Sequence, residues 1–160
     1  MNVDFINPFL HAAVNVLQTM AFTQSAPGKP FLKPHNAPSQ GDVSGIVGLT
    51  GPVNGSVAIS FSEVAILRIV SNMFGEEAKE INEEVRDAVG ELCNMICGDA
   101  RRMLAEKGYQ FQAAIPTVVA GKGHKISHSV AGPSLVIPFV IENDAPFFIE
   151  VCFENGTPSK

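Results

Sequence analysis

The sequence predicts an α+β fold in which two long helices lie side by side on one face of an antiparallel-rich sheet. Apolar residues recur at helical spacing near the start of the chain and again over residues 80–107. Short apolar runs bounded by turn residues fill 43–61 and 134–153, as expected for strands. Hydrophobic residues make up 46% of the 160 residues, which is enough for one core. We therefore expect a single domain over 1–160.

The first helix is expected to begin at Asn7-Pro8, because proline is tolerated in the first turn of a helix. Its apolar face then continues to Met20. Residues 24–42 contain four prolines and no periodicity, so they are expected to form a loop or an extended arm. Residues 155–160 are expected to form a flexible tail.

Turn and cap residues divide the middle of the chain into short elements. Strands are expected over 43–50 and 55–61, joined by a turn at 52–55 that contains Pro, Asn and Gly. A helix should begin after Ser62, because serine is a favourable N-cap residue. It should end at Gly75, because glycine is the usual residue just past a helix.

The second half of the chain is predicted to contain the longest helix, followed by strands. The helix spans about 80–107 and is followed by a glycine. A strand is expected over 115–120. Two more strands, 134–141 and 146–153, should form a hairpin around 142–144.

Composition excludes several classes of protein. The formal net charge of −5 argues against binding to the phosphate backbone of nucleic acids, which requires a basic patch. No apolar run approaches the roughly 20 residues that span a bilayer, so no membrane insertion is expected. The first residues lack the basic region of a secretory signal and include Asp4. Three cysteines, an odd number, fit a reducing compartment, so we expect a cytoplasmic protein.

The longest helix carries an acid and an amide three residues apart. On a helical wheel its apolar residues share one arc, namely Val85, Val89, Leu92, Cys93, Ile96, Ala100, Met103 and Leu104. The opposite arc holds Asp87, Glu91, Asn94, Gly98, Arg101 and Arg102. Glu91 and Asn94 are therefore neighbours on the exposed side. Position alone does not separate a functional pair from an ordinary solvated face.

Three further features have competing interpretations. Cys93 and Cys97 lie toward the apolar arc, so core packing is favoured over metal or redox use. His124 and His128 flank a glycine-rich segment without a third ligand, which favours incidental histidines over a zinc site. Met95 is the one apolar residue beside the polar pair, and it is either a partner contact or an incidental surface methionine.

The spacing Asp87-x3-Glu91-x2-Asn94, within the stretch DAVGELCNMICG, resembles the signature of the CheC/CheX/FliY family of chemotaxis phosphatases. Other stretches also resemble family segments: GPVNGSVAISF before the motif, IPTVVAG after it and FFIEVCF near the end of the chain. The resemblance covers about residues 1–154 and implies a CheC/CheX-like fold.

The chain also contains a weak internal repeat, which predicts a pseudo-two-fold fold. When INPFLHAAVNVLQTM is aligned with RDAVGELCNMICGDA, Asn7 falls on Asp87, and His11 and Val14 fall on the acid and the amide. The hairpins over 45–61 and 136–153 correspond roughly as well. The second copy of the repeat keeps the acid and the amide, whereas the first copy lacks both. This single site makes the chain resemble CheX more than CheC. The alternative is that any two amphipathic helices can be aligned in this way.

The resemblance implies that the protein is an enzyme that hydrolyses the aspartyl-phosphate of a CheY-type response regulator. It implies that Asn94 positions the hydrolytic water and that Glu91 anchors a lysine of the regulator. We expect further partner contacts from Asp87, Met95, Gly98 and Arg101. The chain shows no ligand set for a metal, so no cofactor of its own is expected, and the regulator would carry the Mg²⁺.

The resemblance also implies a homodimer, joined through a C-terminal or edge strand. A second interpretation of the function remains open, in which the domain is a non-catalytic docking module for a regulator or for a sensory or flagellar complex. The intact pair of Glu91 and Asn94 favours the phosphatase. The sequence does not specify which regulator or which signalling pathway is served.

Overall fold

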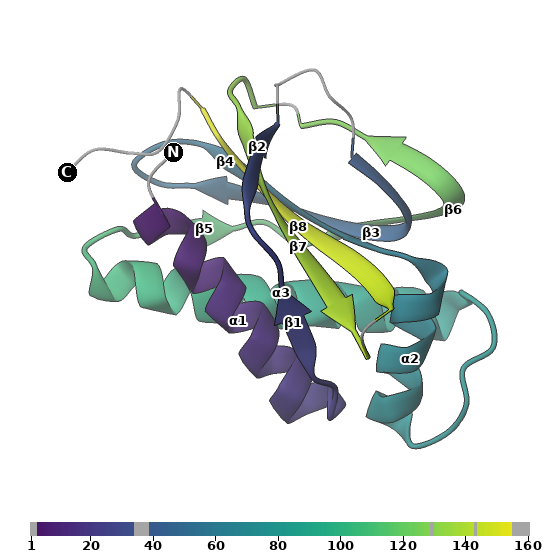
Figure 1. Ribbon diagram of the computed structural model, residues 1–160. Helices are drawn as coiled ribbons and strands as arrows, with labels where there is room; N and C mark the ends of the chain where they lie inside the picture. The colour runs from purple at the N-terminus through teal and green to yellow at the C-terminus, as the bar shows by residue number, and fades with distance from the viewer. Residues whose placement is uncertain (1–2, 34–38, 129, 143, 155–160) are drawn as a thin grey trace.

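The computed structural model describes residues 3–33, 39–128, 130–142 and 144–154. In this part of the chain, helices cover one face of an eight-stranded sheet (Figure 1). The predicted α+β architecture is confirmed, and a shorter helix joins the two long ones on the same face. None of the described helices combines the length and the apolar character needed to cross a bilayer.

The first helix, α1, spans Val3–Ala21. The predicted start at Asn7-Pro8 is wrong, because Pro8 lies inside the helix. Proline has no N–H to donate to the carbonyl four residues earlier, which here belongs to Asp4. Lys107 Nζ donates to this carbonyl at 3.3 Å, so the end of a second helix compensates for the lost helical bond.

The other two helices begin and end at capping residues. Helix α2 spans Glu63–Phe74, where Ser62 Oγ accepts a hydrogen bond from Ala65 N and Gly75 adopts φ 70°. Both predicted caps are confirmed. Helix α3 spans Glu83–Glu106 and begins three residues later than the predicted 80, because the side chain of Asn82 caps it.

Four strands form the centre of the sheet, and every pairing in it is antiparallel. They are β7 (Ser134–Ile141), β8 (Ala145–Phe153), β4 (Gly55–Phe61) and β3 (Ser39–Thr50), in that spatial order. The short strands β1 (Ser25–Pro27) and β2 (Phe31–Lys33) lie along the outer edge of β7. Strands β5 (Gln112–Ala113) and β6 (Thr117–Ile126) lie along β3.

Two predictions about the ends of the sheet require correction. Residues 24–42 are not simply a loop or arm, because β1 and β2 pair with β7 and because β3 begins at Ser39. Pro27 has no backbone N–H to donate. An edge strand tolerates this because it pairs on one side only. The strand expected at 115–120 begins at Thr117 and continues to Ile126. The predicted tail, 155–160, lies outside the described residues.

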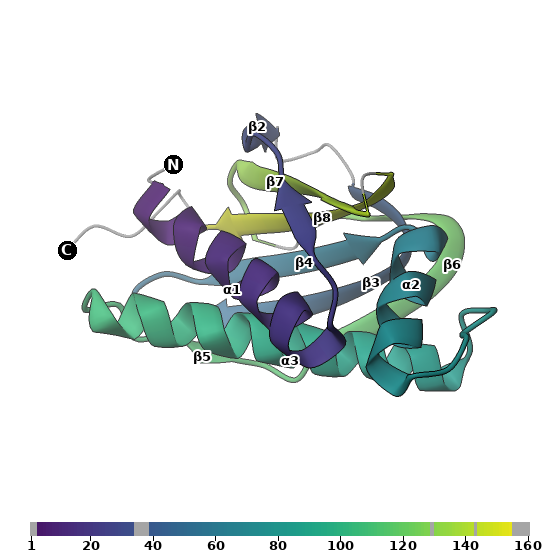
Figure 2. The same cartoon turned by 60° about the horizontal axis from the view of Figure 1, so that its bottom comes forward.

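The sheet has the pseudo-two-fold arrangement that the repeat predicts. Strands β4 and β8 pair at its centre, with Ala58 opposite Glu150 and symmetrical partners on both sides. Each is flanked by the other strand of its own hairpin, β3 or β7. Helices α1 and α3, which carry the two copies of the repeat, pack against each other on the sheet (Figure 2).

The core lies between the helices and the sheet, and one glycine allows α3 to approach closely. Gly45 of β3 faces Cys93, and a Cβ atom at this glycine would overlap the Cys93 sulfur and lie 3.3 Å from the Cys93 Cβ. Gly48, three residues later in β3, faces open space except for Ala114 Cβ at 3.9 Å. A side chain at Gly45 would therefore clash with Cys93, whereas a side chain at Gly48 would meet only a normal contact.

Gly45→Ala is expected to lower the free energy of unfolding by about 1–3 kcal/mol, because the added methyl group overpacks the contact with Cys93. Gly48→Ala should change it far less, which makes it a matched control. Urea unfolding of each variant measures the difference. Adding Cys93→Ala to Gly45→Ala should restore part of the loss if this contact is the cause. Equal stabilities for the two glycine variants would contradict this account.

Candidate functional site

The acid and the amide lie on the exposed side of α3. Leu92, Cys93 and Ile96 are buried against the rest of the core, so the intervening positions Glu91 and Asn94 face outward. Neither the Glu91 nor the Asn94 side chain is engaged in a hydrogen bond or ion pair within the described part of the chain. Both side chains are therefore available to water or to a partner.

A groove of about 530 Å³ runs beside this pair. One wall is α3, and the other is the segment that joins β5 to β6. The lining residues are Glu83, Arg86, Asp87, Gly90, Glu91, Asn94, Ile115, Pro116 and Val118. At Gly90 a Cβ atom would contact Val118 Cγ2 at 3.6 Å, so the absence of a side chain keeps the groove open where the two walls approach.

The α3 wall of the groove carries a row of like charges. Glu83, Asp87 and Glu91 follow one another at four-residue spacing, and all three are exposed. Like charges at this spacing destabilise a helix by about 0.2–0.5 kcal/mol per pair. Arg86 is the basic side chain in the lining. Glu83 lies in the first turn of α3, where a negative charge is favourable. The row as a whole gives this wall of the groove a negative charge that suits a cationic group of a partner.

The other predicted contact residues are less accessible than the helical wheel suggested. Met95 is half-buried and packs against the core instead of standing exposed. Gly98 is half-buried, although a Cβ atom there would meet nothing within 4 Å. Arg101 is half-buried, and its Nη1 donates to the backbone oxygen of Phe111 at 3.2 Å. Of the four predicted contacts, Asp87 alone lines the groove.

The opposite wall of the groove is not predicted by the sequence. Its stretch IPTVVAG is apolar and predicts a strand that includes Ile115 and Pro116. In the structure they precede β6, and the Ile115 side chain is 89% exposed. No signal in the sequence distinguishes this exposed isoleucine from a core isoleucine of the same strand.

The cysteines are core residues, as predicted. Cys93 and Cys97 are buried free thiols. Burial raises the pKa of both thiols, that of Cys97 to about 12, so neither forms a reactive thiolate near neutral pH. This confirms that packing, and not redox chemistry, explains their spacing.

The two histidines also have structural partners. His124 Nε2 lies 2.8 Å from Ser44 Oγ, and His128 Nε2 lies 3.2 Å from Glu150 Oε1. The described residues contain no group of three His, Cys, Asp or Glu side chains placed to hold a metal ion. Each histidine therefore has a polar partner of its own.

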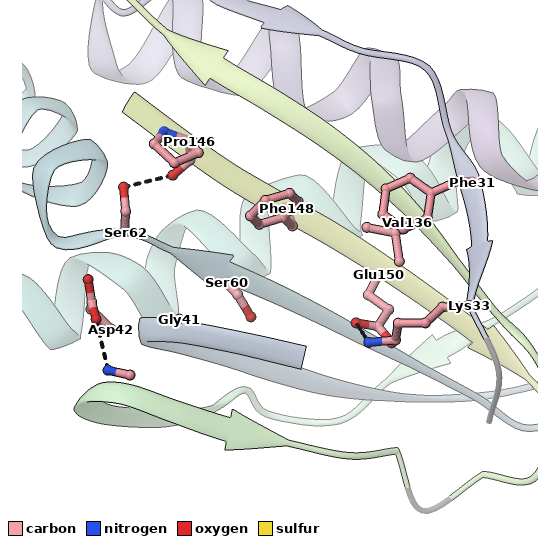
Figure 3. A pocket seen from close by; sticks show the side chains of 11 residues that line it. Phe31, Lys33, Gly41, Asp42, Ser60, Ser62, Val136, Pro146, Phe148 and Glu150 are labelled. Atoms are coloured by element: carbon pink, nitrogen blue, oxygen red, sulfur yellow. Dashed lines mark hydrogen bonds and ion pairs between the residues drawn. The ribbon is translucent and has the colours of Figure 1, made fainter. Parts of the chain in front are cut away.

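A second hollow, of about 490 Å³, lies on the sheet face away from the helices (Figure 3). Phe31, Val136 and Phe148 give it apolar walls. Its polar groups are engaged by the protein itself. Asp42 accepts hydrogen bonds from the backbone N–H groups of Glu63 and Gly123, at 2.8 and 2.9 Å. These contacts link β3, α2 and β6, so they explain the polar lining without a ligand.

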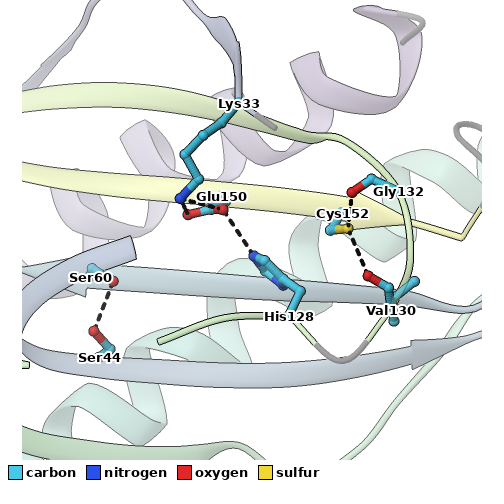
Figure 4. Close-up of polar contacts among 8 residues, drawn as sticks. All are labelled: Lys33, Ser44, Ser60, His128, Val130, Gly132, Glu150 and Cys152. Carbon is cyan, nitrogen blue, oxygen red and sulfur yellow. Dashed lines mark hydrogen bonds and ion pairs between the residues drawn. The ribbon is translucent and has the colours of Figure 1, made fainter. Parts of the chain in front are cut away.

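The far end of this hollow contains a buried ion pair (Figure 4). Glu150, on the central strand β8, is 3% exposed, and its Oε1 lies 2.8 Å from Lys33 Nζ and 3.2 Å from His128 Nε2. Burial alone would raise the pKa of this carboxyl, but the contacts with His128 and Lys33 hold the pKa below its ordinary value. The contact between Lys33 and Glu150 fastens β2 to the sheet.

Comparisons with known proteins identify the family to which the chain is similar. A family model described as chemotaxis phosphatase CheX matches residues 43–140, which include all of α3. A CheC-like superfamily protein from Shewanella sp. PV-4 is 50% identical, with a TM-score of 0.89 over 96% of this chain and 99% of that one. The CheY-P phosphatase CheX of Thermotoga maritima is 27% identical over 98% of this chain and 99% of its own length. The chain is also similar to a solved structure of a CheX–CheY–BeF₃–Mg²⁺ complex from Borrelia burgdorferi. The sequence identity is 31% and the TM-score is 0.80, over 96% of this chain and 99% of that one.

Glu150→Gln is expected to destabilise the protein at pH 7 by about 1.5–3 kcal/mol, the usual value for a hydrogen bond to a charged group. The folded pKa of Glu150 lies below its ordinary value of 4.5. Its contribution is therefore present above that value and is lost as the pH falls through the folded pKa. Urea unfolding measures this contribution. The free energy of unfolding of Glu150→Gln should lie well below that of the unmodified protein at pH 7, and the two values should lie closer together near pH 3.

Glu142→Gln is the matched control, because Glu142 forms an exposed 3.5 Å ion pair with Arg68. Exposed ion pairs of this kind contribute little to the free energy of unfolding. The opposite result is that Glu150→Gln and the unmodified protein differ in free energy of unfolding by the same amount at both pH values. That result would contradict the assigned role of the buried carboxylate.

Proposed function

The chain belongs to the CheX family of chemotaxis phosphatases, and on this basis we propose that it hydrolyses the aspartyl-phosphate of a CheY-type response regulator. The Thermotoga relative acts on CheY-P, and the Borrelia relative is seen in a complex with CheY. The observation that carries the proposal is the exposed pair Glu91 and Asn94, which lines a groove and is free of partners within the described residues.

Asn94 is the proposed water-positioning residue. An aspartyl-phosphate is already an activated acyl phosphate, so hydrolysis needs positioning and charge stabilisation more than a strong nucleophile. The carboxamide of Asn94 can accept a hydrogen bond from water and donate one as well. It carries no charge, so it does not repel the phosphoryl oxygens as a carboxylate would.

Glu91 is the proposed anchor for the regulator. A carboxylate one helical turn from Asn94 can pair with a lysine beside the phosphorylation site. A charge-assisted contact of this kind is stronger and shorter than a neutral one and fixes the relative orientation of the two proteins. The row formed with Glu83 and Asp87 favours approach of the same cationic surface.

The Mg²⁺ required by this chemistry is proposed to belong to the regulator. The Borrelia complex contains Mg²⁺ and BeF₃ together with CheY. Asp87 lines the groove and is proposed to contact the regulator. Contacts from Met95, Gly98 and Arg101, which do not line it, stay predictions. Because the proposed substrate is a response regulator, we propose that the protein acts in the cytoplasm.

A homodimer joined through a sheet edge is also proposed. Strand β6 pairs with β3 on one side, and no described strand pairs with its other side. An open strand edge of ten residues offers a row of backbone donors and acceptors to a second copy.

Light scattering at micromolar concentration should therefore report a mass of about 34 kDa, which is twice the 17.0 kDa of the chain. Pairing of open strand edges is the physical reason for this expectation. The mass should fall toward that of one chain on dilution. A species of 17 kDa at every concentration would contradict the proposed dimer.

Asn94→Ala is expected to reduce the rate of regulator dephosphorylation by about 10²–10³, the usual effect of losing one preorganised catalytic group. Its affinity for the regulator should change little, because docking uses other contacts. Glu91→Ala should weaken both turnover and affinity, because it leaves the regulator's lysine without its partner. Decay of the phosphorylated regulator and a binding titration measure the two effects separately.

His11→Ala is the matched control, because His11 is exposed on α1 at the position that the repeat aligns with Glu91. It should leave both measurements unchanged. Asn94 is exposed, so melting curves should show that Asn94→Ala remains folded. Full activity of Asn94→Ala would sink the catalytic role and leave the non-catalytic docking module as the better account.

A further inference from the structure

We propose that Ile115 is a preformed docking contact that inserts into an apolar depression of the response regulator, next to the lysine that Glu91 would bind. This inference rests on the proposed function, and it names a residue outside the acid and amide pair that determines recognition of the partner. Four features of the structure support it.

The first feature is an irregularity in the sheet. Leu49 of β3 pairs with Ala113 of β5, and Ile46 of β3 pairs with Thr117 of β6. Between these two pairs β3 contributes two residues, whereas the opposite segment contributes three, 114–116. The extra residue is a β-bulge, a device that bends a strand and redirects a side chain.

The second feature is that the bulge is held in place on both sides. The flanking residues are paired with β3, and Ala114 N donates to the backbone oxygen of Gly48 at 2.9 Å. Pro116 fixes its own φ angle and restricts Ile115, the residue before it, to extended conformations. A contact residue that is ordered before binding loses less conformational entropy when the complex forms.

The third feature is the exposure of Ile115. Its side chain is 89% exposed, the largest fraction among the large exposed apolar side chains of the described residues. Single exposed apolar residues are common and need no explanation. An isoleucine that is both exposed and positioned by a bulge beside the proposed site is a different case, because burying it in a partner would contribute strongly to binding.

The fourth feature is the position of Ile115 relative to the acid and the amide. Ile115 and Pro116 form the wall of the groove opposite Glu91 and Asn94. A regulator whose phosphorylation site reaches Asn94 must therefore lie over this wall. An apolar side chain on one wall and a carboxylate row on the other match a partner surface that carries an apolar depression beside a lysine.

A second copy of this chain is the competing occupant of the exposed isoleucine. The proposed dimer uses the open edge of β6, which is a row of backbone groups, whereas Ile115 precedes β6 and lines the groove. The groove also presents three carboxylates, and a second copy with a net charge of −5 offers less complementary charge than a lysine-bearing surface. The regulator is therefore the favoured occupant.

The test compares Ile115→Ser and Ile115→Leu with the unmodified protein. The probes are CheY-type response regulators loaded with BeF₃⁻ and Mg²⁺ for binding, and the same regulators phosphorylated for kinetics. Ile115→Ser is expected to weaken binding and raise KM by about 10–100-fold, typical for loss of an apolar interface anchor. Its kcat should stay within about twofold, because the water-positioning group is untouched. Ile115→Leu should retain binding within about threefold, because it keeps the apolar volume.

Val64→Ser is the matched control, because Val64 is a 51% exposed apolar residue on α2 and does not line the groove. It should bind and turn over as the unmodified protein does. Melting curves should show equal stability for Ile115→Ser, since an exposed side chain contributes little to the core. A folded Ile115→Ser protein with unchanged affinity and KM would overturn the proposal.

Three further outcomes separate this inference from the proposed function. If the unmodified protein binds a regulator without hydrolysing its phosphate, and Ile115→Ser weakens that binding, the docking contact stands and the phosphatase proposal fails. If the unmodified protein binds no regulator, both fail. If Ile115→Ser turns a dimer into a monomer in sedimentation while regulator binding is retained, Ile115 contacts a second copy and the inference is overturned.

Discussion

Close packing of α3 on β3, where Cys93 lies against Gly45, sets the position of the groups in the groove. The helix is amphipathic, so burying one side against the sheet and α1 forces the other side outward. Glu91 and Asn94 are exposed for this reason. The groove lies between this exposed side of α3 and the segment that holds Ile115, Pro116 and Val118. The core and the proposed site therefore use opposite faces of a single helix.

The two faces of the sheet are likewise used differently. The helical face holds the apolar core and carries the groove, whereas the other face is fastened by polar contacts between distant segments. Lys33 and Glu150 are 117 residues apart in the chain, and their ion pair holds β2 on the sheet. Although this face contains a hollow of similar size, its polar atoms already bind one another.

Local signals in the sequence predict both ends of α2 and the exposed position of Glu91 and Asn94, but not the start of α1. Ser62 and Gly75 act within one turn of their own helix, so the ends of α2 were predictable. The edge strands β1 and β2 were missed because their pairing with β7 depends on residues more than 100 positions away. Ile115 was missed because its exposure depends on the register of β5 and β6 along β3, which apolar periodicity does not reveal.

The central claim is that the groove on α3 accelerates hydrolysis and does not merely bind a regulator. The most direct measurement is single-turnover decay of a phosphorylated CheY-type regulator at increasing excess of this protein. The account predicts a rate that rises above the regulator's own decay and saturates, about 10² or more above it. Saturable binding of the phosphorylated regulator with no change in its decay rate would contradict the claim.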